Sequence, residues 1–306
     1  MTQPPSPSLD ASVASIAEEL LRQTLAPAAL YVLATPIGNI ADISLRALKM
    51  LSMVDAIGCE DTRNTAQLLS RYGITNKLFA AHQHNEREVT EKIIQRLHNG
   101  ERIALVSDAG TPAISDPGAR IVDAVLTAGF RVIPIPGASA AITALSATGL
   151  FSDQFYFAGF LPAKTRQRDI ALAALNQMPA TLIFYEAPHR IVETVNALSL
   201  AFGPDRQIVL ARELTKLFEQ IHRCKLGEAS AWLDADPNHQ RGEFVLIVEG
   251  APVASTDAQT QEAERILAIL LETCSVSQAA ALTAQITGQK KNSLYALALT
   301  LEQARS

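Results

Sequence analysis

Cysteine and histidine are scarce in this sequence, and their positions argue against two kinds of site. The three cysteines, Cys59, Cys224 and Cys274, lie far apart along the chain. Such spacing makes neither a disulfide framework nor a zinc cluster, and it is typical of a reducing compartment. The six histidines show no H-E-x-x-H spacing, and the nearby pair His82 and His84 lacks cysteine or carboxylate partners. We therefore expect no metal site.

Long hydrophobic segments are also missing. No apolar run approaches the roughly 20 residues that a membrane-spanning helix needs. Residues 1–10 lack the basic segment and apolar run of a signal peptide. The formal net charge is −5, so any contact with nucleic acid must come from local basic patches. We expect a cytoplasmic protein with no membrane contact.

Two glycine-rich signatures of nucleotide binding are absent. The sequence contains neither G-x-G-x-x-G nor G-x-x-x-x-G-K-[ST]. Without the first, a nicotinamide-dependent oxidoreductase is disfavoured, because nothing cradles the pyrophosphate. Any ligand at the edge of a parallel sheet must be held by other loops.

Short apolar runs alternate with helical patterns from residue 29 onward. The expected strands are 30–34, 54–59, 78–81, 103–106 and 130–135. Ser44 is a candidate N-cap for a helix that begins at Leu45, and Gly73 is a candidate helix end. This alternation predicts an α/β domain over residues 29–149, with a parallel sheet covered by helices on both faces.

The pattern changes near residue 150. Strand-like runs at 155–160, 181–185, 207–211, 217–224 and 244–248 follow in closer succession. They predict a second α/β domain with a mixed sheet over residues 150–250. Three helical runs then predict a small appendage of helix-turn-helix type over residues 260–306. We expect residues 1–28 to be a loosely attached tail.

Lys290 and Lys291 stand at the start of the last helical run. Lysines oppose the helix dipole there, so contact with phosphate would explain them. A solvated helix start or a packing appendage is the alternative, because basic and acidic residues balance from residue 260 onward.

The polar segment SDAGTPAISDPG at 107–118 follows a predicted buried strand. Connections between strands and helices usually need only about 2–6 residues. In open parallel sheets, ligands bind at the carboxyl ends of the strands. We therefore predict a ligand-binding role for this loop, with an ordinary connecting loop as the alternative.

Seven motifs stand out in order along the chain. They are TPIGN at 35–39, EDTR at 60–63, SDAGTP at 107–112 with DPG at 116–118, PGASA at 136–140, FYEAPHR at 184–190, ARELTK at 211–216 and GEFVLIV at 242–248. The set resembles the tetrapyrrole-methylase-like (class III) S-adenosylmethionine methyltransferases. Within that superfamily it is most similar to the branch that methylates a cytidine 2′-hydroxyl in 16S ribosomal RNA. The resemblance runs from about residue 30 to the C-terminus.

The resemblance implies two α/β domains with S-adenosylmethionine in the cleft between them, and usually a homodimer. Relatives that act on tetrapyrroles often carry Asp at the position of Thr111, so the Gly-Thr-Pro run here favours the ribosomal RNA branch. The implied cofactor-binding residues are Pro36, Asp108, Gly110, Thr111, Ile114, Ala138, Ser139, Tyr185, Leu214 and Gly242.

Methyl transfer to a ribose hydroxyl requires alignment of the reacting atoms and removal of the hydroxyl proton. The candidate bases are the strand-end carboxylates, Asp61 first and then Glu60. Asp61 could instead cap a helix beginning at Thr62. Arg63 fits a phosphate clamp, with a surface ion pair as the alternative.

Other residues could hold the RNA outside the cofactor cleft. A basic loop lies beside the aromatic run at 155–157, and basic groups bind phosphate while aromatic rings can stack on bases. Aromatic runs more often belong to a core. The expected RNA contacts are His84, Asn85, Lys164, Arg166 and Arg168.

Two other functions remain open at this point. One is a methyltransferase of the same superfamily that acts on a tetrapyrrole or on another RNA. The other is a binding module that keeps the cleft but performs no chemistry.

Overall fold

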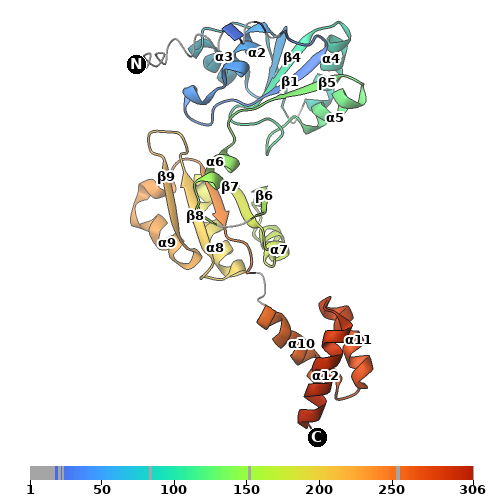
Figure 1. Ribbon diagram of the computed structural model, residues 1–306. Coiled ribbons are helices and arrows are strands. Elements are labelled where there is room, and N and C mark those ends of the chain that lie inside the picture. The colour runs from blue at the N-terminus through green and yellow to red at the C-terminus, as the bar shows by residue number, and fades with distance from the viewer. Residues whose placement is uncertain are drawn as a thin grey trace, which may run out of the picture. The chain divides into compact units, whose positions relative to one another are not determined.

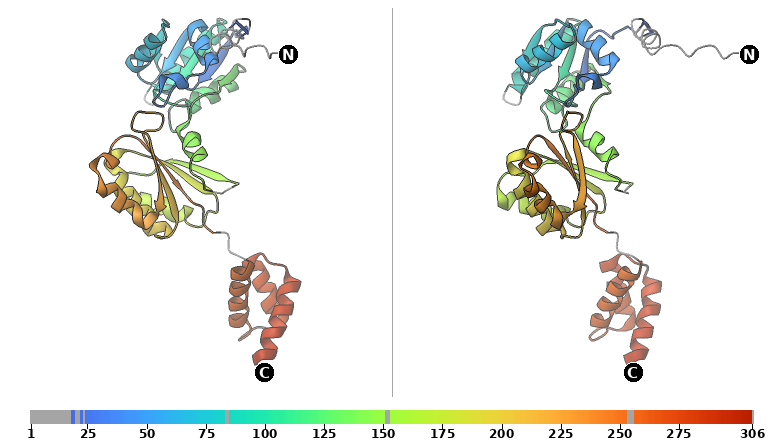
Figure 2. Two further views of the ribbon diagram at one scale, coloured as in Figure 1. Left: turned by 60° about the vertical axis from the view of Figure 1, so that its left-hand side comes forward. Right: turned by 90° about the vertical axis from the view of Figure 1, so that its left-hand side faces the viewer.

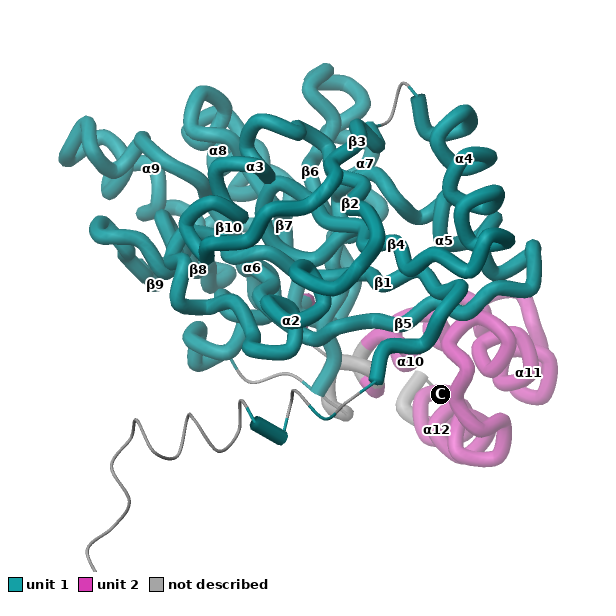
Figure 3. Tube along the Cα trace, turned by 90° about the horizontal axis from the view of Figure 1, so that it is seen from above, with its two compact units in different colours: residues 1–250 teal, residues 251–306 magenta. Residues whose placement is uncertain are grey.

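The computed structural model describes residues 18–19, 22, 24–82, 85–150, 153–252 and 256–305. The chain divides into two compact units, Met1–Gly250 and Ala251–Ser306 (Figures 1 and 3). The first unit contains two five-stranded sheets, and the second contains helices α10, α11 and α12. This architecture confirms the predicted pair of α/β domains followed by a helical region.

The first sheet is entirely parallel, as predicted. Its strand order is β3-β2-β4-β1-β5, so β1 lies between β4 and β5. Because all strands run in one direction, the loops after β1, β2 and β4 meet at one edge of the sheet. The strands are β1 (Ala29–Leu33), β2 (Ala56–Cys59), β3 (Leu78–Ala80), β4 (Arg102–Val106) and β5 (Arg131–Ile135).

Helices cover both faces of this sheet. Successive residues of β1 point to opposite faces: Tyr31 and Leu33 pack with α2 and α3, and Leu30 packs with α4 and α5. Ser44 caps α2 as predicted, because its Oγ accepts a hydrogen bond from the Ala47 N–H at 3.1 Å. The elements that follow the first four strands are η1 (Ile40–Asp42), α2 (Leu45–Met53), α3 (Thr62–Arg71), α4 (Glu86–His98) and α5 (Ala119–Thr127), and α6 (Ala140–Ser146) follows β5 but packs on the second sheet.

The second sheet is mixed, again as predicted. Its order is β6-β7-β10-β8-β9, with β6 and β7 parallel and the other pairs antiparallel. The last edge strand begins later than expected. Leu217 and Phe218 precede it and are 91% and 67% exposed, because successive turns from Glu213 to Glu219 keep this segment out of the sheet. The strands are β6 (Phe155–Phe160), β7 (Thr181–Glu186), β8 (Gln207–Arg212), β9 (Gln220–Lys225) and β10 (Phe244–Val248).

The two faces of the second sheet have different coverings. One face packs on α7 (Thr165–Leu175), α8 (Ile191–Phe202) and α9 (Leu226–Ala235) around a large apolar core. Two short 3₁₀ helices, η2 (Pro188–Arg190) and η3 (Pro237–Gln240), flank these helices. The other face packs on α6 and on Ile37 from the turn after β1. The views in Figures 1 and 2 agree that α6 lies beside the second sheet.

The second unit is a three-helix assembly of α10 (Thr256–Leu270), α11 (Val276–Thr287) and α12 (Lys291–Arg305). Its core alternates small and large side chains, with Ala279 and Ala280 of α11 packed among Leu267 and Leu294. Gly288 ends α11 in a left-handed conformation, φ 71°. In the described part of the chain, no helix has the length and apolar character needed to cross a membrane.

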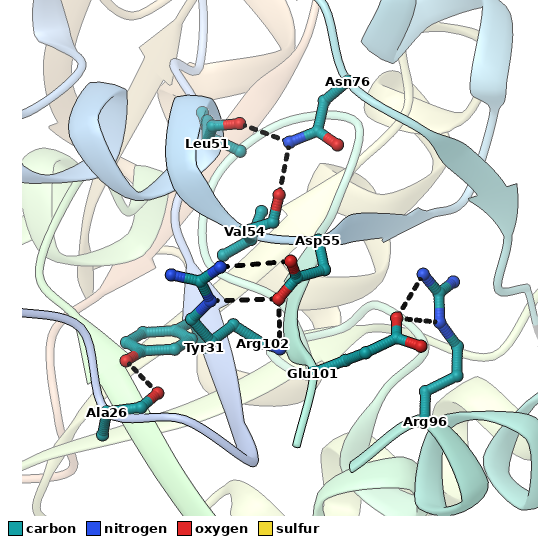
Figure 4. Close-up of polar contacts among 9 residues, drawn as sticks. All are labelled: Ala26, Tyr31, Leu51, Val54, Asp55, Asn76, Arg96, Glu101 and Arg102. Atoms are coloured by element: carbon teal, nitrogen blue, oxygen red, sulfur yellow. Dashed lines mark hydrogen bonds and ion pairs between the residues drawn. The ribbon is translucent and has the colours of Figure 1, made fainter. Parts of the chain in front are cut away.

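A cluster of polar contacts secures the first sheet at the amino ends of its strands (Figure 4). The Arg102 guanidinium donates to both carboxylate oxygens of Asp55, at 3.0 and 3.1 Å, and the Arg102 backbone N–H donates to Asp55 Oδ2 at 2.8 Å. Asn76 Nδ2 donates to the carbonyls of Leu51 and Val54 at 2.8 and 3.0 Å. These bonds join β2 to β4 and fix the turn after α2.

Replacing Asp55 by Ala should lower the free energy of unfolding by about 1–2 kcal/mol, because bonds to a charged group are strong but this pair is partly exposed. The hydrogen bond from Arg102 lowers the pKa of Asp55. The stabilisation should therefore be complete above the unfolded value of about 4 and disappear as the pH falls through the lowered pKa. Urea unfolding at neutral and at strongly acidic pH measures this, with the exposed Asp123→Ala as control. An equal loss at both pH values would contradict the assigned role.

Candidate functional site

The loops after β1 and β4 are joined by their main chains. The Thr35 N–H donates to the Gly110 carbonyl at 2.9 Å, and the Gly110 N–H donates back to the Thr35 carbonyl at 3.0 Å. The Thr35 hydroxyl adds a bond to the Ser107 carbonyl at 3.1 Å. Gly110 adopts φ 79°, a left-handed conformation that favours glycine. These bonds join the two loops at the carboxyl ends of β1 and β4, where the strand pattern predicted a ligand-binding site.

The loop at 107–118 is held in a strained conformation. Ala113 and Ser115 have φ of 67° and 63°, and non-glycine residues in this region each cost about 1–3 kcal/mol. Its end is braced by Glu86, whose Oε1 accepts a hydrogen bond from the Gly118 N–H at 3.2 Å. Ser115 also lies so close to Gly159 of β6 that a Cβ at Gly159 would be 2.9 Å from Ser115 Oγ. A hydrogen bond to the start of α4 and a close approach to β6 therefore fix this loop.

The segment leading into α6 forms a second wall. The Thr111 hydroxyl donates to the Ala138 carbonyl at 3.0 Å, and the Tyr185 hydroxyl accepts from the Ala141 N–H at 3.2 Å. Gly137 closely approaches the residue after β1, since a Cβ there would be 2.8 Å from the Ala34 Cβ. The start of α6 is therefore tied to the loop at 107–118 and to the second sheet.

The turn at 213–216 brings the second sheet against the first. A Cβ at Gly38 would be 3.0 Å from the Leu214 carbonyl, so only glycine fits there without a shift. The Asn39 N–H donates to Thr215 Oγ1 at 3.0 Å. Lys216 pairs with Glu213 at 2.8 Å and with Glu243 at 2.9 Å. These ion pairs stabilise the loops of the second sheet.

These elements enclose a cavity of about 410 Å³, which is within the range of about 300–1,000 Å³ for small-molecule sites. Ile114 and Phe160 expose 43% and 55% of their surface, so apolar groups are offered to a ligand. The lining includes Ile37, Gly110, Thr111, Ile114, Asp116, Ser139, Phe160, Tyr185, Glu186, Leu214, Glu243 and Val245.

The charged residues of the lining are all acidic. Among the described lining residues there are three carboxylates and no lysine or arginine. Glu186 is 3.5 Å from Arg190, and Glu243 is 2.9 Å from Lys216. No ion pair reaches Asp116 from any described residue. Burial, together with the nearby charges of Glu60 and Asp108, raises the pKa of Asp116 to about 6, and the nearby Ser107 hydroxyl only partly opposes the shift.

Asp61 has two structural partners. Its Oδ1 accepts from the Arg63 backbone N–H at 2.8 Å, which confirms the alternative that it caps α3. Its carboxylate also pairs with the Arg63 guanidinium, Oδ2 to Nη2, at 2.8 Å. The hydrogen bond from Arg63 lowers the pKa of Asp61 to about 2. The Arg63 side chain is nevertheless 85% exposed, so much of its guanidinium faces solvent.

The predicted cofactor residues fall into two groups. Those that line the cavity are Gly110, Thr111, Ile114, Ser139, Tyr185 and Leu214. Those that lie next to lining residues in the chain are Pro36, Asp108, Ala138 and Gly242. The Asp108 carboxylate accepts from the Asp61 N–H at 3.1 Å and from Asn64 Nδ2 at 2.8 Å, so it connects the loops after β2 and β4.

Sequence reasoning missed four lining residues of chemical interest, Asp116, Phe160, Glu186 and Glu243. A signal was present for Asp116, because it stands in the quoted DPG motif of the long polar loop. Phe160 ends the aromatic strand β6, whose Phe155 and Tyr156 are 50% and 44% exposed. The aromatic run is therefore only partly a core element.

The predicted RNA contacts are scattered over the first unit. His84 lies outside the described residues. The Asn85 side chain holds the turn after β3, since its Nδ2 donates to the Ala80 carbonyl at 3.0 Å and its Oδ1 accepts from the His82 N–H at 2.9 Å. Lys164 is exposed at the start of α7, and Arg166 is exposed on its first turn.

The prediction that Arg168 belongs to an exposed basic loop is wrong. Arg168 lies on α7, its side chain is only 4% exposed, and it pairs with Glu193 at 2.9 Å. The helix begins at Thr165, and its periodicity turns Arg168 toward α8 rather than toward solvent. Lys164 and Arg166 remain as the exposed basic residues of this segment.

Within the described ranges, no group of three or more His, Cys, Asp or Glu residues could hold a metal ion.

Comparison with known families gives two matches. Residues 29–230 match the family described as "Tetrapyrrole (Corrin/Porphyrin) Methylases", and residues 257–302 match the "RsmI C-terminal HTH domain". A protein named "Ribosomal RNA small subunit methyltransferase I" from Escherichia coli O157:H7 is 51% identical over 270 residues, covering 88% of this chain and 94% of the relative. One of the same name from Pseudomonas aeruginosa is 50% identical over 272 residues, covering 88% and 96%.

Solved structures share the fold. Cobalt precorrin-4 methyltransferase aligns with a TM-score of 0.55 at 15% identity, over 72% of this chain and 95% of that one. Uroporphyrin-III C-methyltransferase from Thermus thermophilus, complexed with S-adenosylhomocysteine, aligns with a TM-score of 0.51 at 17% identity, over 72% and 96%.

Arg168→Ala should lower the free energy of unfolding by about 2 kcal/mol, because it removes a buried, ion-paired side chain. The matched variant Arg166→Ala, two positions earlier on the exposed side of α7, should change it by less than about 0.5 kcal/mol. Denaturant unfolding of both variants provides the measurement. Similar effects of the two substitutions would refute the assigned difference.

Proposed function

This chain belongs to the tetrapyrrole methylase family, and from that premise we propose that it transfers a methyl group from S-adenosylmethionine to a cytidine 2′-hydroxyl of 16S ribosomal RNA. The relatives that match nearly its whole length are named as small-subunit ribosomal RNA methyltransferases. The observation that carries the proposal is the cavity between the two sheets, which offers carboxylates and apolar surface but no lysine or arginine among its described lining residues.

The residues of the cavity fit S-adenosylmethionine. A nucleotide with phosphates would find no cation among the described lining residues, whereas a positively charged sulfonium is attracted by carboxylates. Ile37, Leu214 and Val245 offer apolar contacts for an adenine, and Thr111 and Ser139 offer hydroxyls for polar groups of the ligand. When bound, the sulfonium supplies an electrophilic methyl group. The protein has to align the acceptor oxygen with it and receive the acceptor's proton.

The loop after β2 is our candidate for positioning the RNA. Asp61 holds the Arg63 guanidinium, and the exposed remainder of that planar group suits phosphate oxygens. The prediction that Asp61 acts as the base remains untested. Its capping bond, its ion pair and its low pKa favour the positioning role instead. Glu60, His84 and Asn85 stay candidates for contacts with the same nucleotide.

The remaining parts of the proposal concern location and assembly. An enzyme that modifies ribosomal RNA works where that RNA is found, so we place this one in the cytoplasm. We also propose a homodimer, as the family resemblance implies. The basic contacts outside the cavity are assigned to Lys164 and Arg166.

Isothermal titration should detect one S-adenosylmethionine site per chain. Incubation with labelled donor should transfer methyl groups to small-subunit RNA, at a cytidine ribose identified by mass spectrometry. A tetrapyrrole acceptor offered in parallel should remain unlabelled. Donor binding without transfer to RNA would exclude this acceptor, and labelling of the tetrapyrrole would assign the chain to the other branch of its family.

Replacing Lys164 and Arg166 together by Ala should weaken RNA binding and reduce its salt dependence, since each lost phosphate contact removes about 0.7 from the slope of log K against log salt. The matched control is Lys77→Ala with Arg131→Ala, two exposed basic residues that precede β3 and begin β5. Filter binding over a salt series measures both double variants. Equal slopes for the two would remove this segment from the RNA-binding surface.

A further inference from the structure

Asp116 lies in a loop whose conformation is fixed by hydrogen bonds on both sides of it. The left-handed residues Ala113 and Ser115 precede it, and the Ala113 N–H donates to the Pro117 carbonyl at 3.3 Å across it. Glu86 is 8% exposed and accepts from the Gly118 N–H, so a nearly buried carboxylate anchors the loop directly after Asp116. Strain of this kind persists only where surrounding contacts enforce it, and it concentrates at functional sites.

Asp116 also differs from the other carboxylates of the cavity. Glu186 accepts from the Ala187 N–H at 2.8 Å and faces Arg190, and Glu243 faces Lys216. Both are therefore committed to structural partners. No described lysine or arginine forms an ion pair with Asp116, and the Ser107 hydroxyl nearby donates its hydrogen bond to the Gly110 carbonyl at 2.9 Å. Asp116 is therefore the lining carboxylate that no described lysine or arginine neutralises.

The groups facing Asp116 disfavour its charged form. Glu60 directly after β2 and Asp108 in the same loop are both acidic, and their charges raise the pKa of Asp116. Tyr185 from the second sheet is an uncharged neighbour, and the charge of Asp116 raises the pKa of its phenol. Burial is the largest influence, and the pKa of Asp116 is raised to about 6. Burial also raises the pKa of Tyr185, so this phenol stays protonated at neutral pH. A base works best when its pKa lies near the operating pH.

We propose that Asp116, rather than Asp61, accepts the proton of the ribose 2′-hydroxyl, an inference that rests on the proposed methyl transfer and specifies its base. The 2′-oxygen forms the new bond to the methyl carbon, and the carbon–sulfur bond breaks with its electron pair left on sulfur. The hydroxyl proton passes to the Asp116 carboxylate, which later releases it to water. Thr111 and Ser139 line the same cavity, so the base and the cofactor-binding hydroxyls share one enclosure.

The test compares Asp116→Asn with the wild type in four measurements. In the ligand-free protein, a carbon-13 carboxyl resonance should titrate near pH 6 and be missing from the variant. S-adenosylmethionine should still bind the variant, with an affinity no more than about tenfold weaker, because the substitution removes one of the three lining carboxylates that attract the sulfonium. The variant's methylation rate should fall by about 100- to 10,000-fold, the usual contribution of a general base. The wild-type kcat/KM should rise with pH through about 6, and the variant should lose this dependence.

Asp123→Asn, an exposed carboxamide substitution on α5, is the control and should behave as wild type throughout. Near-wild-type turnover in Asp116→Asn, or a slow variant that keeps the dependence near pH 6, would overturn the proposal. So would a slow variant that has lost cofactor binding, because Asp116 would then hold the cofactor. A wild-type protein that binds no S-adenosylmethionine would overturn the proposed function as well, whereas an active Asp116→Asn would overturn the base assignment alone.

Discussion

The two main-chain hydrogen bonds between Thr35 and Gly110 are the contact on which the site depends. β1 and β4 are neighbours in the sheet, but the loops that follow them lie far apart along the chain. Without these two hydrogen bonds, the main chains of the loops would not be linked. The paired backbone groups bind the short turn after β1 to the long loop after β4. Because these groups belong to the main chain, the link constrains the path of both loops whatever side chains they carry. The strained residues Ala113 and Ser115 therefore follow a loop segment whose position is fixed.

The second sheet supplies the remaining walls of the cavity. The face of this sheet that lies away from α7, α8 and α9 packs on α6 and Ile37. The turn at 213–216 lies so close to Gly38 that a side chain there would require a shift. Ser115 reaches the bulged part of β6 near Gly159. The cavity therefore has walls from both sheets, and each wall is set by backbone proximity. Many other α/β proteins bind a ligand with a glycine-rich phosphate loop, whereas here the cavity lies between two sheets.

Much of the fold could be predicted from the sequence because it follows local rules. Apolar runs marked β1 and β4, Ser44 marked the start of α2, and the closer spacing of strands after residue 150 marked the mixed sheet. What could not be predicted depended on tertiary contacts. Arg168 looked like a surface cation until helix phase and Glu193 placed it inside, and the turns after β8 delayed β9. The raised pKa of Asp116 depends on burial and on the charges of Glu60 and Asp108, which follow two different strands and which no local pattern brings together.

The strand order has a consequence for synthesis of the chain. Leu30 of the central strand pairs with Ile103 on one side and with Val132 on the other, so both neighbours of β1 emerge from the ribosome long after it. At about 5–20 residues per second, roughly 4–15 s pass before the first of them is available. During that interval an apolar strand has two unsatisfied edges, the state most prone to wrong pairing. The nascent chain is therefore exposed to wrong strand pairing until β4 and β5 have been synthesised.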